Sequence, residues 1–145
     1  MNHWPKFAAE IMTSEVVTLE ENDNLTFLDE SMHALRFRHL PVVDGKRLIG
    51  LVTQRDVMRV SASSLLPASR QQTALLTRKF LVRDVMARNV QTVRPDTPLA
   101  EVAKLLWQKK VGCLPVVEGE NTLVGIITEA DFVRLFAQFF QKMVT

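Results

Sequence analysis

The sequence predicts a mixed α/β (α+β) fold built from two copies of one strand–helix–strand–strand–helix unit, βαββα. Two observations lead to this prediction. The chain of 145 residues carries an internal repeat over nearly its whole length, and each copy shows the same succession of strand and helix patterns. The composition, with 47% hydrophobic and 23% charged residues, is typical of a globular chain with a buried core.

The internal repeat consists of short segments that recur in the same order. Leu-Pro-Val-Val-Asp-Gly at 40–45 returns as Leu-Pro-Val-Val-Glu-Gly at 114–119. Gly-Leu-Val-Thr-Gln-Arg-Asp at 50–56 returns as Gly-Ile-Ile-Thr-Glu-Ala-Asp at 125–131. The offset is 74 residues for the first pair and 75 for the second. The one extra residue falls between the two segments, where a turn is expected and an insertion costs little.

Two apolar runs in each copy predict a β-hairpin. In the first copy, residues 40–43 and 48–52 flank Asp44-Gly45, a dipeptide that favours a tight turn. The runs are almost continuously apolar, which indicates strands that are buried on both faces. A short β-branched segment from Val16 to Leu19 precedes them and predicts the first strand.

Apolar stripes at helical spacing predict the helices. One stripe in the first copy is Leu25, Leu28, Met32 and Leu35, and its counterpart is Leu99, Val102, Ala103 and Leu106, with Gly112 expected to stop that helix. The stripe of the last helix is Phe132, Phe136, Phe139, Phe140 and Met143. Two interpretations of the last stripe remain open, because it can pack on the core of its own chain or against a second subunit.

These elements place the first copy at residues 7–61 and the second at 79–140. The segment 62–78 between them contains Ser, Pro and polar residues, and we expect it to be a connector.

A Thr-x-x-Asp motif opens the last helix of each copy. Thr53 and Thr128 are natural N-cap residues, and Asp56 and Asp131 stand three residues later, at the capping-box position. One interpretation of the motif is therefore purely structural.

Motifs of the common enzyme classes are missing from the sequence. It contains no glycine-rich phosphate loop, no nucleophile elbow and no His, Cys and carboxylate residues at metal-ligand spacing, so we expect no catalytic residue and no metal site. The net charge of +2 is too small to indicate a nucleic-acid partner. Neither a secretory signal nor a bilayer-spanning run of roughly 20 apolar residues is found. The single cysteine, Cys113, suits a reducing compartment, so we expect a cytoplasmic protein with no membrane span.

The ordered set of motifs resembles the CBS domain, a repeat named after cystathionine β-synthase. The resemblance rests on Ile-Met-Thr or Val-Met-Ala before the first strand, on Leu-Pro-Val-Val-Asp/Glu-Gly, and on Gly-h-h-Thr-x-x-Asp, where h is apolar. It implies two βαββα repeats related by pseudo-two-fold symmetry, with two clefts between them. Such clefts commonly bind AMP, ADP, ATP, S-adenosylmethionine or cyclic dinucleotides. The modules usually form homodimers and regulate an attached or separate effector protein, and no cofactor is required.

The resemblance also implies which residues contact such a ligand. The Thr and Asp of Thr-x-x-Asp are expected to contact ribose, residues just before Leu-Pro to reach phosphate, and backbone near the first strand to recognise adenine. The expected ligand-binding residues in this sequence are Thr13, Val16, Arg38, His39, Pro41, Thr53, Arg55, Asp56, Val90, Lys110, Gly112, Pro115, Thr128 and Asp131.

The residue types suit these roles. One ionised carboxylate, such as that of Asp56 or Asp131, can accept hydrogen bonds from both hydroxyls of a ribose. Free N–H groups at a helix start favour phosphate, and the guanidinium forks of Arg38 and Arg55 match phosphate oxygens. A solvated basic edge is the alternative interpretation of these two arginines.

The two copies differ where phosphate contacts are expected. Gly112-Cys113 stands in place of Arg38-His39, and Ala130 stands in place of Arg55. We therefore expect one occupied site and one weak or empty site.

These observations predict a regulatory module that binds an adenine nucleotide or another adenosyl ligand in the cleft between the repeats. It would modulate a separate partner and catalyse nothing itself. Two alternatives remain open. The first is a ligand-free dimerisation and interaction scaffold. The departures in the second copy favour it for one cleft, whereas Arg38, Arg55 and the two aspartates oppose it for the other. The second is an undetected nucleotide hydrolase, which the missing nucleophile, base and metal ligands oppose.

Overall fold

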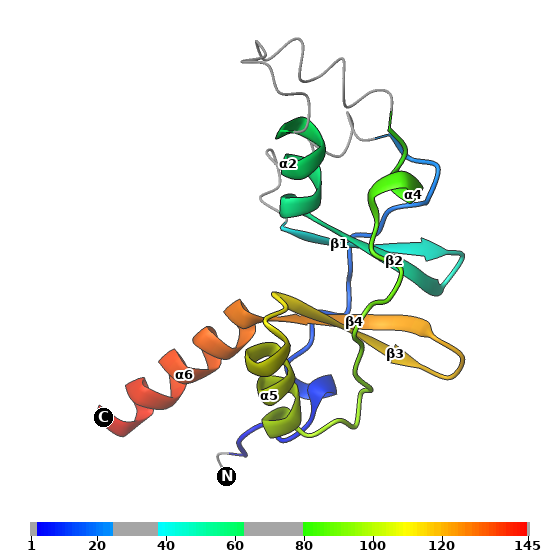
Figure 1. Cartoon of the computed structure of the whole chain (residues 1–145). Helices are drawn as coiled ribbons and strands as arrows, with labels where there is room; N and C mark the ends of the chain where they lie inside the picture. The colour runs from blue at the N-terminus through cyan, green and yellow to red at the C-terminus, as the bar shows by residue number, and fades with distance from the viewer. Residues whose placement is uncertain (1–2, 25–37, 63–79, 145) are drawn as a thin grey trace. The chain divides into compact units, whose positions relative to one another are not determined.

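The computed structural model of the chain describes residues 3–24, 38–62 and 80–144 (Figure 1). It divides into two compact units, Val17–Val90 on the one hand and Met1–Val16 with Gln91–Thr145 on the other. We call them the Asp56 unit and the Asp131 unit, after the aspartates of the two Thr-x-x-Asp motifs. The helix expected over 25–35, and nearly all of the connector expected at 62–78, lie outside the described residues.

The Asp56 unit is built around the expected hairpin. Strands β1 (His39–Asp44) and β2 (Arg47–Thr53) pair antiparallel, and Gly45 takes a left-handed φ of 63° in the turn, as the Asp-Gly pair predicts. Helix α2 (Gln54–Ala62) follows β2 directly, and the short helix α4 (Val82–Val85) belongs to the same unit. The core is made of buried apolar side chains: Leu19, Leu40, Val42, Val52, Val57, Val82 and Met86.

The Asp131 unit repeats this plan. Strands β3 (Cys113–Glu118) and β4 (Thr122–Thr128) form the second antiparallel hairpin, helix α5 (Leu99–Lys109) precedes it, and helix α6 (Glu129–Val144) follows it. The turn accommodates the extra residue with left-handed φ values of 56° at Gly119 and 73° at Asn121. A short 3-10 helix, η1 (Ala8–Glu10), also belongs to this unit. The buried core consists of Ala8, Val93, Val102, Leu106, Leu114, Val116 and Ile127.

The first strand expected in each copy is an extended segment that pairs at a single residue. Leu19 forms a parallel bridge with Val42, donating to the carbonyl of Pro41 at 2.9 Å and accepting from the N–H of Val43 at 2.9 Å. Val93 forms the corresponding bridge with Val116. Burial explains the short pairing in the first copy, because Leu19 is 4% exposed whereas Val17 is 46% exposed.

The segment that precedes each first strand belongs to the unit of the other copy. Ala87, next to Met86 of the second copy, exchanges both backbone hydrogen bonds with Leu51 of β2, at 2.9 and 3.0 Å. Gly50 makes this approach possible, because a Cβ there would lie 2.6 Å from the Met86 Sδ and 3.1 Å from the Ala87 carbonyl oxygen. The first copy's segment mirrors this in the Asp131 unit.

In that unit the N-terminal segment lies against β4. Thr13 exchanges two backbone hydrogen bonds of 3.0 Å with Ile126. A Cβ on Gly125 would lie 2.5 Å from the Met12 Sδ, which explains why glycine stands at the same place in both hairpins. The compact units therefore combine residues from both sequence copies.

Candidate functional site

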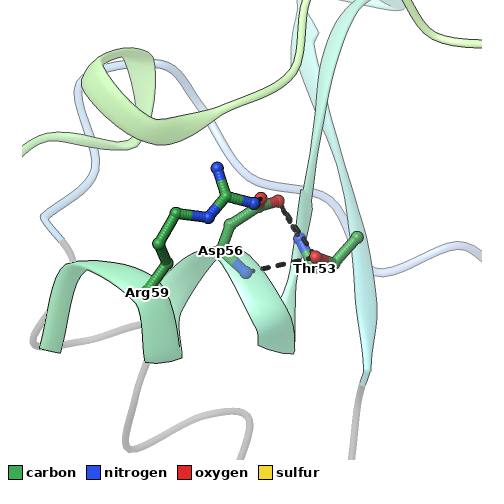
Figure 2. Close-up of polar contacts among 3 residues, drawn as sticks. All are labelled: Thr53, Asp56 and Arg59. Carbon is green, nitrogen blue, oxygen red and sulfur yellow. Dashed lines mark hydrogen bonds and ion pairs between the residues drawn. The ribbon is translucent and has the colours of Figure 1, made fainter. Parts of the chain in front are cut away.

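The Thr53–Asp56 motif lies where β2 ends and α2 begins. The Asp56 Oδ2 accepts hydrogen bonds from the Thr53 backbone N–H at 2.9 Å and from the Thr53 hydroxyl at 3.0 Å (Figure 2). The Asp56 N–H donates in turn to the Thr53 Oγ1 at 3.3 Å. This reciprocal pattern is a capping box, so the structural interpretation of the motif is confirmed.

The Thr128–Asp131 motif repeats the carboxylate half of this pattern between β4 and α6. The Asp131 Oδ2 accepts from the Thr128 N–H at 2.7 Å and, over a longer distance of 3.4 Å, from the Thr128 hydroxyl. Asp131 is 7% exposed, and it is the one buried charged residue in the part of the chain that the structure describes. At the start of each helix, the capping carboxylate and the free N–H groups form a fixed array of polar atoms.

An arginine completes each pair, although neither arginine was among the predicted site residues. The Arg59 Nη2 donates to the Asp56 Oδ1 at 3.0 Å, and Figure 2 shows its guanidinium lying over the Asp56 carboxylate. Arg134 forms the equivalent ion pair with the Asp131 Oδ1. The signal was present in the sequence, because the two arginines also lie 75 residues apart and each stands three residues after its aspartate.

The structure brings several expected residues of the Asp56 unit to the end of the hairpin. His39, the first residue of β1, is paired with Thr53, and the Arg38 carbonyl accepts from the Gln54 N–H at 2.9 Å. The side chains of Arg38 and Arg55 are exposed, so both are accessible to an anion.

Two further expected residues of the Asp56 unit are not exposed. Pro41 is buried, and its carbonyl is already bonded to the Leu19 N–H. Val90 is half-buried.

The Asp131 unit brings the equivalent residues to the end of its hairpin, but fewer of them are charged. The Gly112 carbonyl accepts from the Glu129 N–H at 3.3 Å, and Cys113 is paired with Thr128. Thr13 is exposed beside Ile126 of β4, two residues before Thr128. The hairpin end therefore carries a glycine and a buried cysteine where the Asp56 unit carries Arg38 and His39.

The other expected residues of this unit are placed as follows. Lys110 is exposed and ends α5 with a left-handed φ of 53°, which moves the helix stop two residues ahead of the expected Gly112. Pro115 is buried with its carbonyl bonded to the Val93 N–H at 3.0 Å. Val16 is half-buried.

Cys113 does not provide a reactive thiolate. It is 2% exposed, and burial raises the pKa of its thiol to about 12. In the described parts of the chain, no three His, Cys, Asp or Glu side chains gather as a metal site would require. The same parts contain no helix that is long and apolar enough to cross a bilayer.

The duplicated hairpins and Thr–Asp motifs define the class of the protein. The sequence model of the CBS domain family matches residues 8–63 and 82–138, so the chain belongs to the CBS domain family. A CBS domain-containing protein of Dictyostelium discoideum is 29% identical over 135 residues, which is 92% of this chain and 93% of that protein.

Some relatives are enzymes that are much longer than the match. A homoserine O-acetyltransferase of Methanohalobium evestigatum is 25% identical over 134 residues, which is 92% of this chain but 24% of that enzyme. The chain therefore spans about a quarter of this relative.

Solved structures agree over nearly the whole chain. A candidate acetoin utilization protein (AcuB) from Vibrio cholerae is 34% identical, with a TM-score of 0.76 and 93% of each chain covered. The CBS domain pair of protein MJ0100, in complex with 5′-methylthioadenosine and S-adenosyl-L-methionine, is 26% identical, with a TM-score of 0.77 over 92% of this chain and 98% of that one. CBSX2 in complex with AMP is also 26% identical, with a TM-score of 0.77 over 93% and 98%.

Proposed function

We propose that the chain is a regulatory module that binds an adenosyl ligand at its Thr–Asp hairpin ends, modulates a separate partner protein and catalyses nothing itself. The observation that carries this proposal is the duplicated Thr–Asp geometry in a CBS pair. It is supported by the similarity to pairs that bind AMP, S-adenosylmethionine and 5′-methylthioadenosine.

The chemistry of ribose recognition starts from a carboxylate held in place by its own helix. The Thr N–H and hydroxyl fix the Oδ2 of Asp56 and Asp131, so the carboxylate is oriented before any ligand arrives. Because the side chain is already ordered, little of its conformational entropy is lost when a ribose donates its two hydroxyls to the carboxylate. The helix start adds N–H groups and positive dipole that favour a phosphate.

We assign the phosphorylated ligand to the Asp56 unit. Its hairpin end carries Arg38 and Arg55 as exposed cations, together with the Asp56 carboxylate for ribose. The corresponding positions of the Asp131 unit are Gly112 and Ala130, so a phosphate there would rely on Lys110 and its neighbour Lys109. AMP, ADP or ATP is therefore the expected ligand of the Asp56 unit, and weaker binding is expected at the other end.

A screen by thermal unfolding tests the proposal. Purified protein is heated with AMP, ADP, ATP, S-adenosylmethionine, NAD and cyclic di-AMP, with GMP as the control for the base. A ligand at about 100 times its dissociation constant stabilises the folded state by roughly 2.7 kcal/mol, which raises the midpoint by several degrees. Stabilisation by an adenosyl ligand supports the proposal. A transition that none of them moves, in protein that carries no copurified nucleotide, refutes it.

We include a homodimer in this proposal because helix α6 exposes an apolar surface that a second copy of the chain can cover. Helix α6 exposes Val133, Phe136, Phe140 and Met143, each by more than half of its surface. Phe136, Phe139 and Leu135 also line an apolar groove with Trp4. Covering such a patch with a second copy removes apolar area from water, and this is the dimerisation surface on which the alternative of an interaction scaffold depends. A cytoplasmic location completes the proposal and is supported by the unpaired, buried thiol.

A further inference from the structure

The arginine of each motif occupies the carboxylate oxygen that faces away from the cap. The Asp56 Oδ2 is engaged by both Thr53 donors, and the Oδ1 is engaged by Arg59. The same division holds at Asp131, where Arg134 takes the Oδ1. Because the arrangement recurs in both units, it is a property of the motif rather than of one surface side chain.

The carboxylate of Asp56 has too few free acceptor directions for both hydroxyls of a ribose. An ionised carboxylate offers about four directions, two on each oxygen. Within the described residues, three of those of Asp56 are used by Thr53 and Arg59. A ribose needs two acceptors to donate both adjacent hydroxyls, so one protein bond has to yield. A 2′-deoxyribose has a single hydroxyl at this edge and needs only one acceptor.

The bond of Arg59 is the one that yields at the lowest cost. The Arg59 side chain is 72% exposed, so its guanidinium regains water when it leaves Asp56. The Thr53 N–H is part of the backbone and cannot move away without opening the cap. At Asp131 the longer hydroxyl bond of Thr128, at 3.4 Å, can also yield, so the competition there is weaker.

We propose that Arg59 and Arg134 set the sugar selectivity of their sites by competing with the ribose diol for the Oδ1 of Asp56 and Asp131. This inference rests on the proposed function, because it presupposes that an adenosyl ligand binds there. It predicts that removing the guanidinium favours ribose ligands over their 2′-deoxy counterparts.

The test is a set of calorimetric titrations with matched ligands. AMP and 2′-deoxy-AMP, and adenosine and 2′-deoxyadenosine, are titrated into wild type, Arg59→Gln and Arg134→Gln. The readout is the ratio of the 2′-deoxy Kd to the ribose Kd. This ratio cancels any attraction of the arginine for phosphate and any general loss of stability. Asp56→Asn and Asp131→Asn identify the end that the ligand uses, and the arginine at the other end is the matched control.

We expect the arginine variant at the working end to raise the ratio about two- to five-fold, the range that corresponds to an exposed ion pair, and the control variant to leave it unchanged. A ratio that stays constant or falls overturns the selectivity proposal while ligand binding, and with it the proposed function, stands. If neither ligand pair binds wild type, the selectivity proposal fails, and the proposed function fails with it when the thermal screen also finds no adenosyl ligand that stabilises the protein.

Discussion

At the scale of the residue, the cap of the Thr-x-x-Asp motif also positions the carboxylate that we propose as the ribose contact. Asp56 caps its helix through Thr53, and the cap holds the carboxylate at the hairpin end. Sequence alone predicted this geometry because the contact spans only three residues. It did not predict Arg59, although Arg59 obeys the same spacing, because a surface arginine is ordinarily solvated and only its recurrence as Arg134 marks it.

The buried thiol of Cys113 makes the free energy of unfolding depend on pH in the alkaline range. Its pKa is raised by burial to about 12 in the folded chain, against about 9 when exposed. The thiol is therefore neutral in both states below about pH 9. Between about pH 9 and pH 12 the unfolded chain ionises first, so the free energy of unfolding falls by up to about 1.4 kcal/mol per pH unit. Urea unfolding at pH 8 and pH 10 measures this, with Cys113→Ala as the control that lacks the thiol. An identical decline in both proteins contradicts the prediction.

At the scale of the element, patterns that are local in the chain were predicted well. The Asp-Gly and Glu-Gly turns predicted both hairpins because their left-handed glycines are encoded on the spot. The first strands shrank to single bridges, and α5 stopped at Lys110 rather than Gly112. The short pairing of the first strands depends on packing against β1 and β3, which the apolar pattern of one segment does not contain.

The exposed face of α6 leads to a prediction about assembly. We expect wild type to form a dimer of the 16.5 kDa chain, because Phe136 and Phe140 stack on each other at 6.0 Å and more than half of each residue is exposed. Phe140→Glu places a charge in that surface and should yield a monomer in light scattering after size exclusion. Gln138→Glu adds the same charge at another exposed position of α6 and should remain dimeric. A monomeric wild type at the same concentration contradicts the dimer.

At the scale of the whole molecule, each compact unit contains chain from both sequence copies. The repeat boundaries at 7–61 and 79–140 remain a prediction from the sequence, whereas the two units are defined by packing. Met12 and Met86 explain the difference, because each is seated against the hairpin glycine of the other copy. Sequence reasoning missed this exchange because it joins residues far apart in the chain, and no local pattern encodes such a contact.

The exchange predicts which hairpin is destabilised by a substitution in the N-terminal segment. Ala8 is fully buried in the core of the Asp131 unit, so Ala8→Asp should open β3 and β4 while β1 and β2 keep their protection. Hydrogen exchange followed by mass spectrometry resolves the two hairpins. Ala9→Asp is the matched control, because Ala9 is exposed beside it. Loss of protection in β1 and β2 alone would show that the assignment of the segment is wrong.

The central claim is that an adenosyl ligand is held by the carboxylate of Asp56. Calorimetric titration of AMP into wild type and Asp56→Asn tests it most directly, with Asp44→Asn as a control that removes an exposed carboxylate of the same unit. Hydrogen bonds to a charged group contribute about 1.5–3 kcal/mol, so we predict AMP binding about 10- to 100-fold weaker in Asp56→Asn and unchanged in Asp44→Asn. Equal affinity of wild type and Asp56→Asn for AMP would contradict the claim.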